Sequence, residues 1–233
     1  MEKQSPLISV IMPLYNAERF VGESICNILG QTVGDFELIV IDDASTDSSY
    51  DIASRYAAQD ARIVLMRNDA NHGAAYTRNR GLETARGSFI TFMDADDRCS
   101  PERFARQTAF FGQHPQIDLC GSYYTMFGPD DAREQKIQDP ITHEGIRIQM
   151  LFGCPFAMSG VMMRRGAFLR SGVRFRATMA EDYLFWAELS GHMRMANIPE
   201  HLSFYRRWEN QLSTSQLDRQ TLSAQSIQRD LLR

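Results

Sequence analysis

The sequence contains no long hydrophobic run. Of its 233 residues 43% are hydrophobic, yet no segment approaches the roughly 18 continuous apolar residues that a membrane-spanning helix needs. The apolar stretch nearest the N-terminus, residues 7–12, is too short for the hydrophobic core of a signal peptide. We therefore expect a cytoplasmic protein, either soluble or attached peripherally to the inner face of the membrane.

Cysteine, lysine and excess positive charge are also scarce. The four cysteines are widely separated and form no Cys-x-x-Cys pair, which favours reduced thiols over a zinc site or a disulfide framework. Lysine occurs only at Lys3 and Lys136. A net charge of -4 and an isoelectric point near 5.8 argue against a protein that coats nucleic acid. We expect no nucleic-acid partner.

What the sequence does contain is an alternation of apolar runs with segments of helical periodicity. This alternation predicts an α/β fold with a doubly wound, mostly parallel central sheet and helices on both faces. Pro13 is expected to end the first strand because proline cannot donate to a sheet ladder. The predicted strands are 7–12, 36–41, 62–66 and 88–93, and the predicted helices are 17–31, a segment ending near 58, 73–85 and one starting at Ser100.

Beyond residue 113 the pattern is looser. A partly exposed helix is expected in the last twenty or so residues, which are rich in Gln and Arg with spaced leucines. The other expected elements are a strand at 117–127, a polar loop at 129–140, a helix at 142–152, a strand at 161–163 and a helix from 180 to 189.

Polar residues follow three of the predicted strands. They are Tyr15 and Asn16, then Asp42 and Asp43, then the segment 94–97 with the sequence DADD. In open α/β sheets, ligands bind at the edge formed by the carboxyl ends of the strands. Clustered acids repel one another unless a cation compensates, and an Asp-x-Asp pair suits Mg²⁺ or Mn²⁺ completed by diphosphate oxygens and water. Solvated loop acids or helix caps are the alternative.

Five segments in order carry a family resemblance. They are SVIMPLYN at 9–16, IDDASTD at 41–47, RNRGL at 78–82, DADD at 94–97 and AED at 180–182. Together they resemble the family 2 inverting glycosyltransferases, which have the GT-A fold. The resemblance implies transfer of one sugar from a nucleotide-diphosphate donor, a UDP-sugar, to an acceptor hydroxyl in bacterial surface polysaccharide or glycoconjugate assembly. It also implies a nucleotide-sugar-binding half at 1–112 and an acceptor-binding half at 113–233 with a helical tail.

The resemblance assigns the donor contacts. It implies that Pro13, Tyr15 and Asp43 contact the nucleoside, with the Tyr15 ring packing on the base and Asp43 accepting from its imide N–H. Arg78 would help to hold the nucleotide, since a guanidinium suits a uracil carbonyl or a phosphate. Strand-end packing and a surface helix arginine are the alternatives for these residues.

The resemblance also assigns the metal and the base. Asp96 would be the direct ligand of Mg²⁺ or Mn²⁺, while Asp94 orients the ribose or a metal-bound water. Asp182 would be the general base, with Glu181 beside it. Inversion needs a base on the face opposite the leaving group. An acidic first turn favoured by the helix dipole is the alternative for Glu181 and Asp182.

The sequence departs from the family pattern near the C-terminus. Some members carry a metal-ligating histidine in a Tyr-Arg-x-His-like stretch, but here Trp208 follows Tyr205-Arg206-Arg207. An indole cannot coordinate a cation, so either His201 or water replaces the histidine, or the site has only one firm protein ligand and a weak affinity for free metal. The Gln-x-x-Arg-Trp motif of processive synthases is absent, which favours single addition. The acceptor is expected to be a saccharide or a lipid-linked saccharide.

A basic stretch at 164–176 contains five arginines together with Phe168 and Phe175. We interpret it as a solvated face, with docking on anionic membrane lipid or a phosphorylated carrier as the alternative. Other protein classes fit less well. Phospho-acceptor domains need a late lysine, and nucleotide-sugar pyrophosphorylases need a glycine-rich basic loop where this chain has 13–17. A non-catalytic sugar-nucleotide binder stays open.

Overall fold

The computed structural model describes residues 5–128, 134–208 and 217–232. Its centre is one sheet with the strand order β3-β2-β1-β4-β8-β6-β9-β5, and β7 pairs with β6. Strands β3, β2, β1 and β4 are parallel, whereas the rest of the sheet is antiparallel except for β6 with β9. The strands are β1 Ile8–Leu14, β2 Phe36–Asp42, β3 Ile63–Arg67, β4 Phe89–Phe92, β5 Arg98–Cys99, β6 Leu119–Phe127, β7 Gln135–Ile137, β8 Met162–Arg164 and β9 Met195–Arg206.

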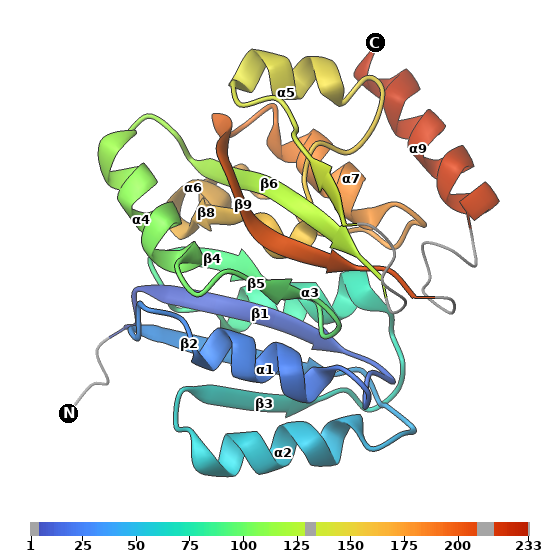
Figure 1. The fold of residues 1–233 in the computed structure, drawn as a ribbon. Helices are drawn as coiled ribbons and strands as arrows, with labels where there is room; N and C mark the ends of the chain where they lie inside the picture. The colour runs from blue at the N-terminus through green and yellow to red at the C-terminus, as the bar shows by residue number, and fades with distance from the viewer. Residues whose placement is uncertain (1–4, 129–133, 209–216, 233) are drawn as a thin grey trace.

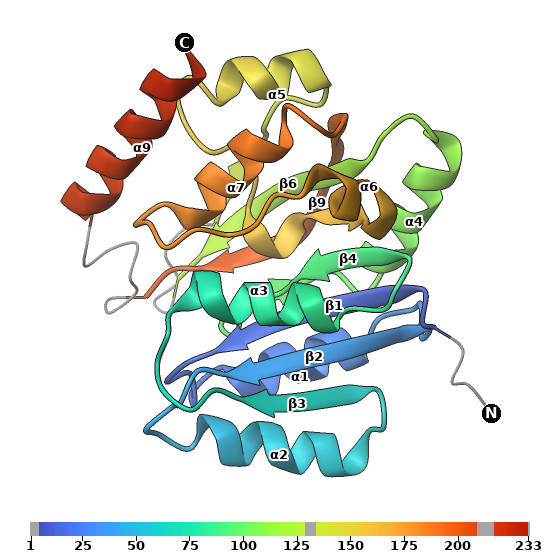
Figure 2. The same ribbon diagram turned by 180° about the vertical axis from the view of Figure 1, so that it is seen from behind.

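Helices cover both faces of the parallel part of the sheet, as a doubly wound fold requires. α1 and α2 lie in front of it in Figure 1, and α3 lies in front of it in Figure 2, where the molecule is seen from behind. The helices are α1 Val21–Leu29, α2 Ser49–Gln59, α3 Ala74–Thr84, α4 Arg103–Gln113, α5 His143–Gln149, α6 Arg165–Ser171, α7 Glu181–Leu189 and α9 Leu217–Leu231, with a 3₁₀ turn at Met158–Gly160. No helix in these described ranges is both long and apolar enough to cross a membrane.

β1 is buried on both faces, which explains its continuous apolar sequence. Val10 and Met12 belong to the core cluster beneath α1 and α2, whereas Ile11 belongs to the cluster that contains α3. Alternate side chains of one strand therefore supply two separate cores. The strand is held in place from both sides, so its C-terminal end is a rigid platform.

Gly81 lets α3 approach the sheet closely. A Cβ atom at this position would overlap Ile11 Cγ2 and would lie 3.2 Å from Ile41 Cδ1. Glycine inside a helix costs roughly 0.5–1 kcal/mol relative to alanine, so its use here reflects the close packing. Arg78 lies one turn earlier on the same helix.

The structure corrects several sequence predictions. β1 does not stop at Pro13 but continues to Leu14, because β4 pairs with β1 only as far as Ile11 and Pro13 pairs with β2 alone. The helix predicted to start at Ser100 begins at Arg103. β5 and β9 were not predicted. β9 contains Pro199 beside an irregularity in its pairing with β6, which interrupts the apolar alternation.

The basic stretch is only partly a surface feature. α6 begins inside it, and Phe168 and Phe175 are buried in the core, where Phe175 stacks on Phe185. Arg170 and Arg174 are exposed. Any membrane-facing role would therefore rest on arginines and not on the two phenylalanines. The expected loop at 129–140 contains β7, and its residues 129–133 lie outside the described ranges.

Candidate active site

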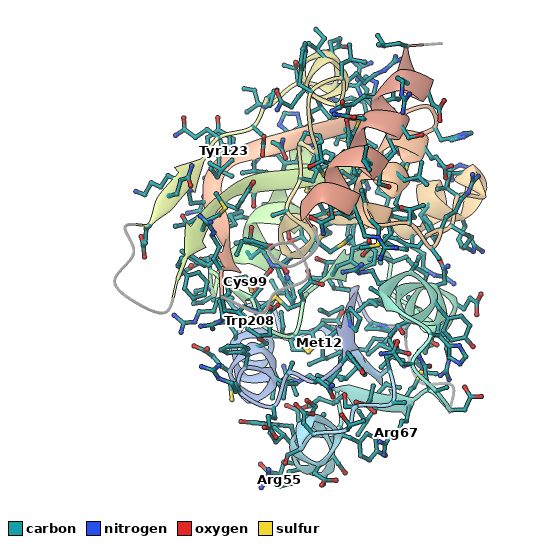
Figure 3. The ribbon with its side chains drawn as sticks, turned by 90° about the vertical axis from the view of Figure 1, so that its right-hand side faces the viewer. Met12, Arg55, Arg67, Cys99, Tyr123 and Trp208 are labelled. Carbon is teal, nitrogen blue, oxygen red and sulfur yellow. The ribbon has the colours of Figure 1, made fainter. Side chains whose placement is uncertain are left out.

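The polar segments after β1, β2 and β4 meet at one edge of the sheet. The Asp43 amide donates to the Leu14 carbonyl over 2.8 Å, and the Thr46 amide donates to Asn16 Oδ1 over 2.9 Å. These bonds join the loops after β1 and β2, and β4 lies directly beside β1. Figure 3 looks onto this edge. The sequence prediction that these segments converge is confirmed.

Asp43 is buried and held by donors from the loop that precedes α3. Its side chain accepts from the Gly73 amide (2.7 Å), the His72 amide (3.0 Å) and the Asn68 side-chain amide. The next residue, Ala44, has φ 57°, a left-handed conformation that is unusual for a residue other than glycine. Strain of this kind concentrates at functional sites. The carboxylate of Asp43 is thus fixed before any ligand arrives.

Tyr15 presents an open aromatic surface at the same edge. It is 47% exposed and lies between Pro13, which pairs with Ile41, and Asn16, which has φ 46°. Exposed rings of this size offer a stacking surface for a planar base. Pro13 and Tyr15 therefore lie at the same edge of the sheet as Asp43.

The acidic loop, residues 94–97, is tied to the 3₁₀ turn by Ser159. The Asp94 amide donates to Ser159 Oγ over 3.0 Å, and Ser159 Oγ donates to Asp97 Oδ2 over 2.7 Å. Burial raises the pKa of Asp97 well above its ordinary value, and the neighbouring charges of Asp96 and Asp94 raise it further. Asp97 is therefore an internal support of the loop and does not face solvent.

The end of β9 closes over the acidic loop. Arg206 donates its amide to Asp97 Oδ1 (2.9 Å) and its Nε to the Asp96 carbonyl (2.6 Å). Trp208 Nε1 donates to Asp96 Oδ2 over 2.9 Å. Burial raises the pKa of Asp96, and the charge of Asp94 raises it further. The two carboxylates of the Asp-x-Asp pair thus lie close enough to repel each other.

Arg78 joins this loop to α7. Its Nη2 lies 2.9 Å from Asp94 Oδ1 and its Nη1 lies 2.8 Å from Glu181 Oε1. The residue is only 6% exposed, and its guanidinium packs on the ring of Phe175. Both terminal nitrogens are therefore occupied by carboxylates. In this arrangement Arg78 holds two parts of the site together.

Asp182 follows Glu181 in the first turn of α7. Burial raises the pKa of Asp182 to about 6; the charge of Glu181 adds to this, and that of Arg78 opposes it. A carboxyl group with a pKa near the operating pH is well suited to general-base catalysis. The same α7 end therefore carries an ion-paired acid, Glu181, and an acid with a raised pKa, Asp182.

His201 does not join the acidic loop. Its Nδ1 lies 3.1 Å from the Tyr124 carbonyl and 3.3 Å from Thr125 Oγ1, and its ring packs on Tyr123. It lies five positions before Arg206 on β9, or roughly 16 Å at the usual rise of a strand. The contacts of His201 are therefore with β6 and not with the acidic loop, which gives no support to His201 as the replacement for the family histidine.

Residues 9–172 match the model described as Glycosyl transferase family 2. The chain belongs to glycosyl transferase family 2. It is 33% identical to an uncharacterized glycosyltransferase of Haemophilus influenzae, covering 97% of this chain and 73% of that one. It is 31% identical to the putative teichuronic acid biosynthesis glycosyltransferase TuaG of Bacillus subtilis, over 66% of this chain and 62% of that one.

Solved structures show that this glycosyltransferase has the GT-A type of fold. TarS of S. aureus in complex with UDP-GlcNAc superposes with a TM-score of 0.75 at 24% identity, covering 89% of this chain and 60% of that one. The mannosyltransferase PcManGT of Pyrobaculum calidifontis, in complex with GDP-Man and Mn2+, superposes with a TM-score of 0.71 at 19% identity. The superposition covers 95% of this chain and 65% of that one. At these identities the likeness concerns the fold.

The family match ends before α7. It includes Asp43, Arg78 and the acidic loop, whereas Asp182 and Trp208 lie beyond residue 172. The sequence alone assigns no role to Ser159, whose only signal is its place in a stretch of small residues. At Trp208 the sequence shows only the absence of a family ligand and does not indicate the bond to Asp96.

Asp94 and Asp96 are the carboxylates that would hold a divalent cation together with a phosphate ligand. Across residues 5–128, 134–208 and 217–232, no group of three or more His, Cys, Asp or Glu side chains is arranged to hold a metal ion. Asp94 and Asp96 supply two carboxylates, and the bonds to Arg78 and Trp208 each engage one oxygen. Mg²⁺ and Mn²⁺ commonly take one or two protein carboxylates and complete their shell with phosphate and water.

Proposed function

We propose that this glycosyltransferase transfers one sugar from a UDP-sugar to an acceptor hydroxyl, with inversion at the anomeric carbon and with a divalent cation. The observation that carries the proposal is the pair of ion contacts from Arg78 to Asp94 and Glu181. These contacts hold the acidic loop and the end of α7 that carries Asp182 at one edge of the sheet. A single displacement needs both sets of groups around the same anomeric carbon.

Asp43 is proposed to recognise the nucleoside. Its Oδ2 accepts one bond from Gly73 and keeps a free lone pair for an imide N–H of the base. Tyr15 and Pro13 would pack on the base. The complex of TarS with UDP-GlcNAc supports a uridine nucleotide, whereas PcManGT binds GDP-Man.

We propose that Asp96 would bind Mg²⁺ or Mn²⁺ directly and that Asp94 would orient the ribose or a metal-bound water. When bound, the cation supplies Lewis-acid neutralisation of the leaving diphosphate. Arg78 donates to one carboxylate oxygen of Asp94, so only the other oxygen would be available to the cation. The complex of PcManGT with Mn2+, in a structure of similar fold, supports a cation here.

Asp182 is proposed to take the proton from the acceptor hydroxyl. The acceptor oxygen forms a bond to the anomeric carbon while the bond from that carbon to the diphosphate oxygen breaks. The proton ends on Asp182 and the electron pair leaves with the nucleoside diphosphate. Glu181, which is committed to Arg78, holds the end of α7 and is the less suitable base.

The acceptor is proposed to be a saccharide or a lipid-linked saccharide of a surface polysaccharide. The name of TuaG, which refers to teichuronic acid biosynthesis, supports this class. We place the reaction at the cytoplasmic side, where the exposed Arg170 and Arg174 would give peripheral contact with anionic lipid. The chain spans 60% of the TarS chain with which it superposes.

A donor panel tests the proposal. UDP-, GDP- and dTDP-sugars would be screened by thermal stabilisation and by release of the nucleoside diphosphate in Mn²⁺. The expected result is stabilisation and turnover by a UDP-sugar, with a product of inverted anomeric configuration by NMR. Binding without turnover for every acceptor class would favour a non-catalytic sugar-nucleotide binder, and retention of configuration would exclude single displacement.

A further inference from the structure

Trp208 is fixed in place by two unlike contacts. Its indole Nε1 donates to Asp96 Oδ2 over 2.9 Å, and its ring centroid lies 5.6 Å from that of Phe20 at a tilt of 58°. Phe20 immediately precedes α1, and Figure 3 shows Trp208 beside this helix. The indole N–H can only donate, so its partner must be an acceptor such as this carboxylate.

The main chain of Asp96 is held from the same direction. Arg206 Nε donates to the Asp96 carbonyl, and the Arg206 amide donates to Asp97 Oδ1. The guanidinium of Arg206 also lies over the rings of Phe20 and Phe127. Residues 206–208 therefore restrain both the backbone and the side chain of Asp96.

We propose that Trp208 is a positioning residue that presents a single oxygen of Asp96 to the donor diphosphate and its cation. This rests on the proposed function. The indole occupies Oδ2 and leaves Oδ1, so Asp96 would bind through one oxygen in a fixed orientation. Mg²⁺ and Mn²⁺ favour regular octahedral geometry. Outer hydrogen bonds that orient a ligand commonly change metal affinity by about 10- to 100-fold when removed.

The variant Trp208→Phe distinguishes the contribution of the indole N–H from that of the aromatic ring. The variant deletes the donor and keeps an aromatic side chain against Phe20. Mn²⁺ affinity would be measured by electron paramagnetic resonance with UDP present, and UDP affinity would be measured separately in EDTA. We expect Mn²⁺ to bind about 10- to 100-fold more weakly, with an unchanged UDP Kd in EDTA and an unchanged melting temperature.

Phe20→Leu is the matched control, because it alters the ring contact and keeps the N–H. It should lose much less Mn²⁺ affinity than Trp208→Phe, because the N–H bond to Asp96 remains. Mn²⁺ binding by Trp208→Phe as tight as in the wild type would overturn the proposal. A parallel loss of Mn²⁺ affinity, UDP affinity in EDTA and melting temperature would also overturn it, since that pattern indicates a purely structural role. If the wild type bound UDP equally well in Mn²⁺ and in EDTA, the cation of the proposed function would itself be excluded.

Discussion

Arg78 and Glu181 are 103 positions apart in the sequence and form an ion pair of 2.8 Å. Arg78 contacts Asp94 with its other terminal nitrogen. One guanidinium thus fixes the distance between the acidic loop and the first turn of α7. This relationship places the proposed base, Asp182, next to the proposed donor site.

Replacing Arg78 should damage both stability and catalysis. Arg78→Met leaves Asp94 and Glu181 without their partner, and breaking a largely buried ion pair of this kind should cost about 2–3 kcal/mol of unfolding free energy after allowance for the partners' partial exposure. Arg78→Lys should recover part of the stability but little of kcat, because a single ammonium group cannot contact both carboxylates as the two terminal nitrogens of a guanidinium do. Arg55→Met, on the exposed face of α2, is the control. Wild-type kcat in Arg78→Met would contradict the positioning role.

Asp182→Asn should abolish most turnover while sparing donor binding. The change keeps the shape of the side chain but removes the basic oxygen, so kcat should fall by something like 10²–10⁴. Because the proton is removed only as the acceptor attacks, kcat and kcat/KM should fall together. Steady-state kinetics combined with donor calorimetry would show this. Wild-type turnover would refute the assignment and make Glu181 the next candidate.

The activity should have an acidic limb governed by Asp182. Its pKa is raised to about 6, and only the deprotonated form can accept a proton, so the rate should decline as the pH falls through about 6. A pH–rate profile at saturating donor would measure this. A rate that stays constant down to pH 4.5 would show that Asp182 does not titrate in the reaction.

The same carboxyl group should make the stability depend on pH. Because its pKa in the folded protein is above the ordinary 3.8, ionising Asp182 destabilises the fold. That cost is absent below about pH 3.8 and complete above about pH 6. Asp182→Asn should therefore melt at a higher temperature than the wild type at pH 7.5, with the difference disappearing near pH 4. A mutant less stable than the wild type at pH 7.5 would contradict this.

Asp43 should contribute to nucleotide binding and, separately, to the fold. Asp43→Asn loses the charge and should weaken nucleotide affinity by roughly 1.5–3 kcal/mol, the value of a charge-assisted hydrogen bond. Asp43→Ala should in addition lower the melting temperature, since the amides of His72 and Gly73 lose their acceptor. Asp69→Ala, an exposed acid on the same loop, is the control. Unchanged affinity in Asp43→Asn would place the base pocket elsewhere.

The parallel part of the fold was predictable because its signals are local. β1, β2, β3 and β4 are mainly apolar runs, and the polar residues that follow β1, β2 and β4 converge simply because parallel strands end at one edge. The second part of the sheet was less accessible. β5 has two residues and β9 contains Pro199, so neither shows the period that identifies a strand.

The long-range contacts of the site were beyond sequence reasoning. Nothing in the chain around Arg78 indicates that Glu181 occupies one of its nitrogens, and nothing around Trp208 indicates a bond to Asp96. These pairings depend on how β9 and α7 return to the first half of the sheet. The raised pKa of Asp182 likewise arises from burial and a neighbouring charge, which only the folded chain creates.

The most direct test of the proposed donor site is calorimetry of UDP binding in Mn²⁺ and in EDTA, for the wild type and for Asp96→Asn. Asp94 and Asp96 would otherwise present bare negative charge to the diphosphate. We predict tight binding by the wild type only with Mn²⁺, and binding by Asp96→Asn that is weak under both conditions. Equal UDP affinity in Mn²⁺ and EDTA, or an Asp96→Asn variant that keeps the full Mn²⁺ effect, would contradict a cation held by this acidic loop.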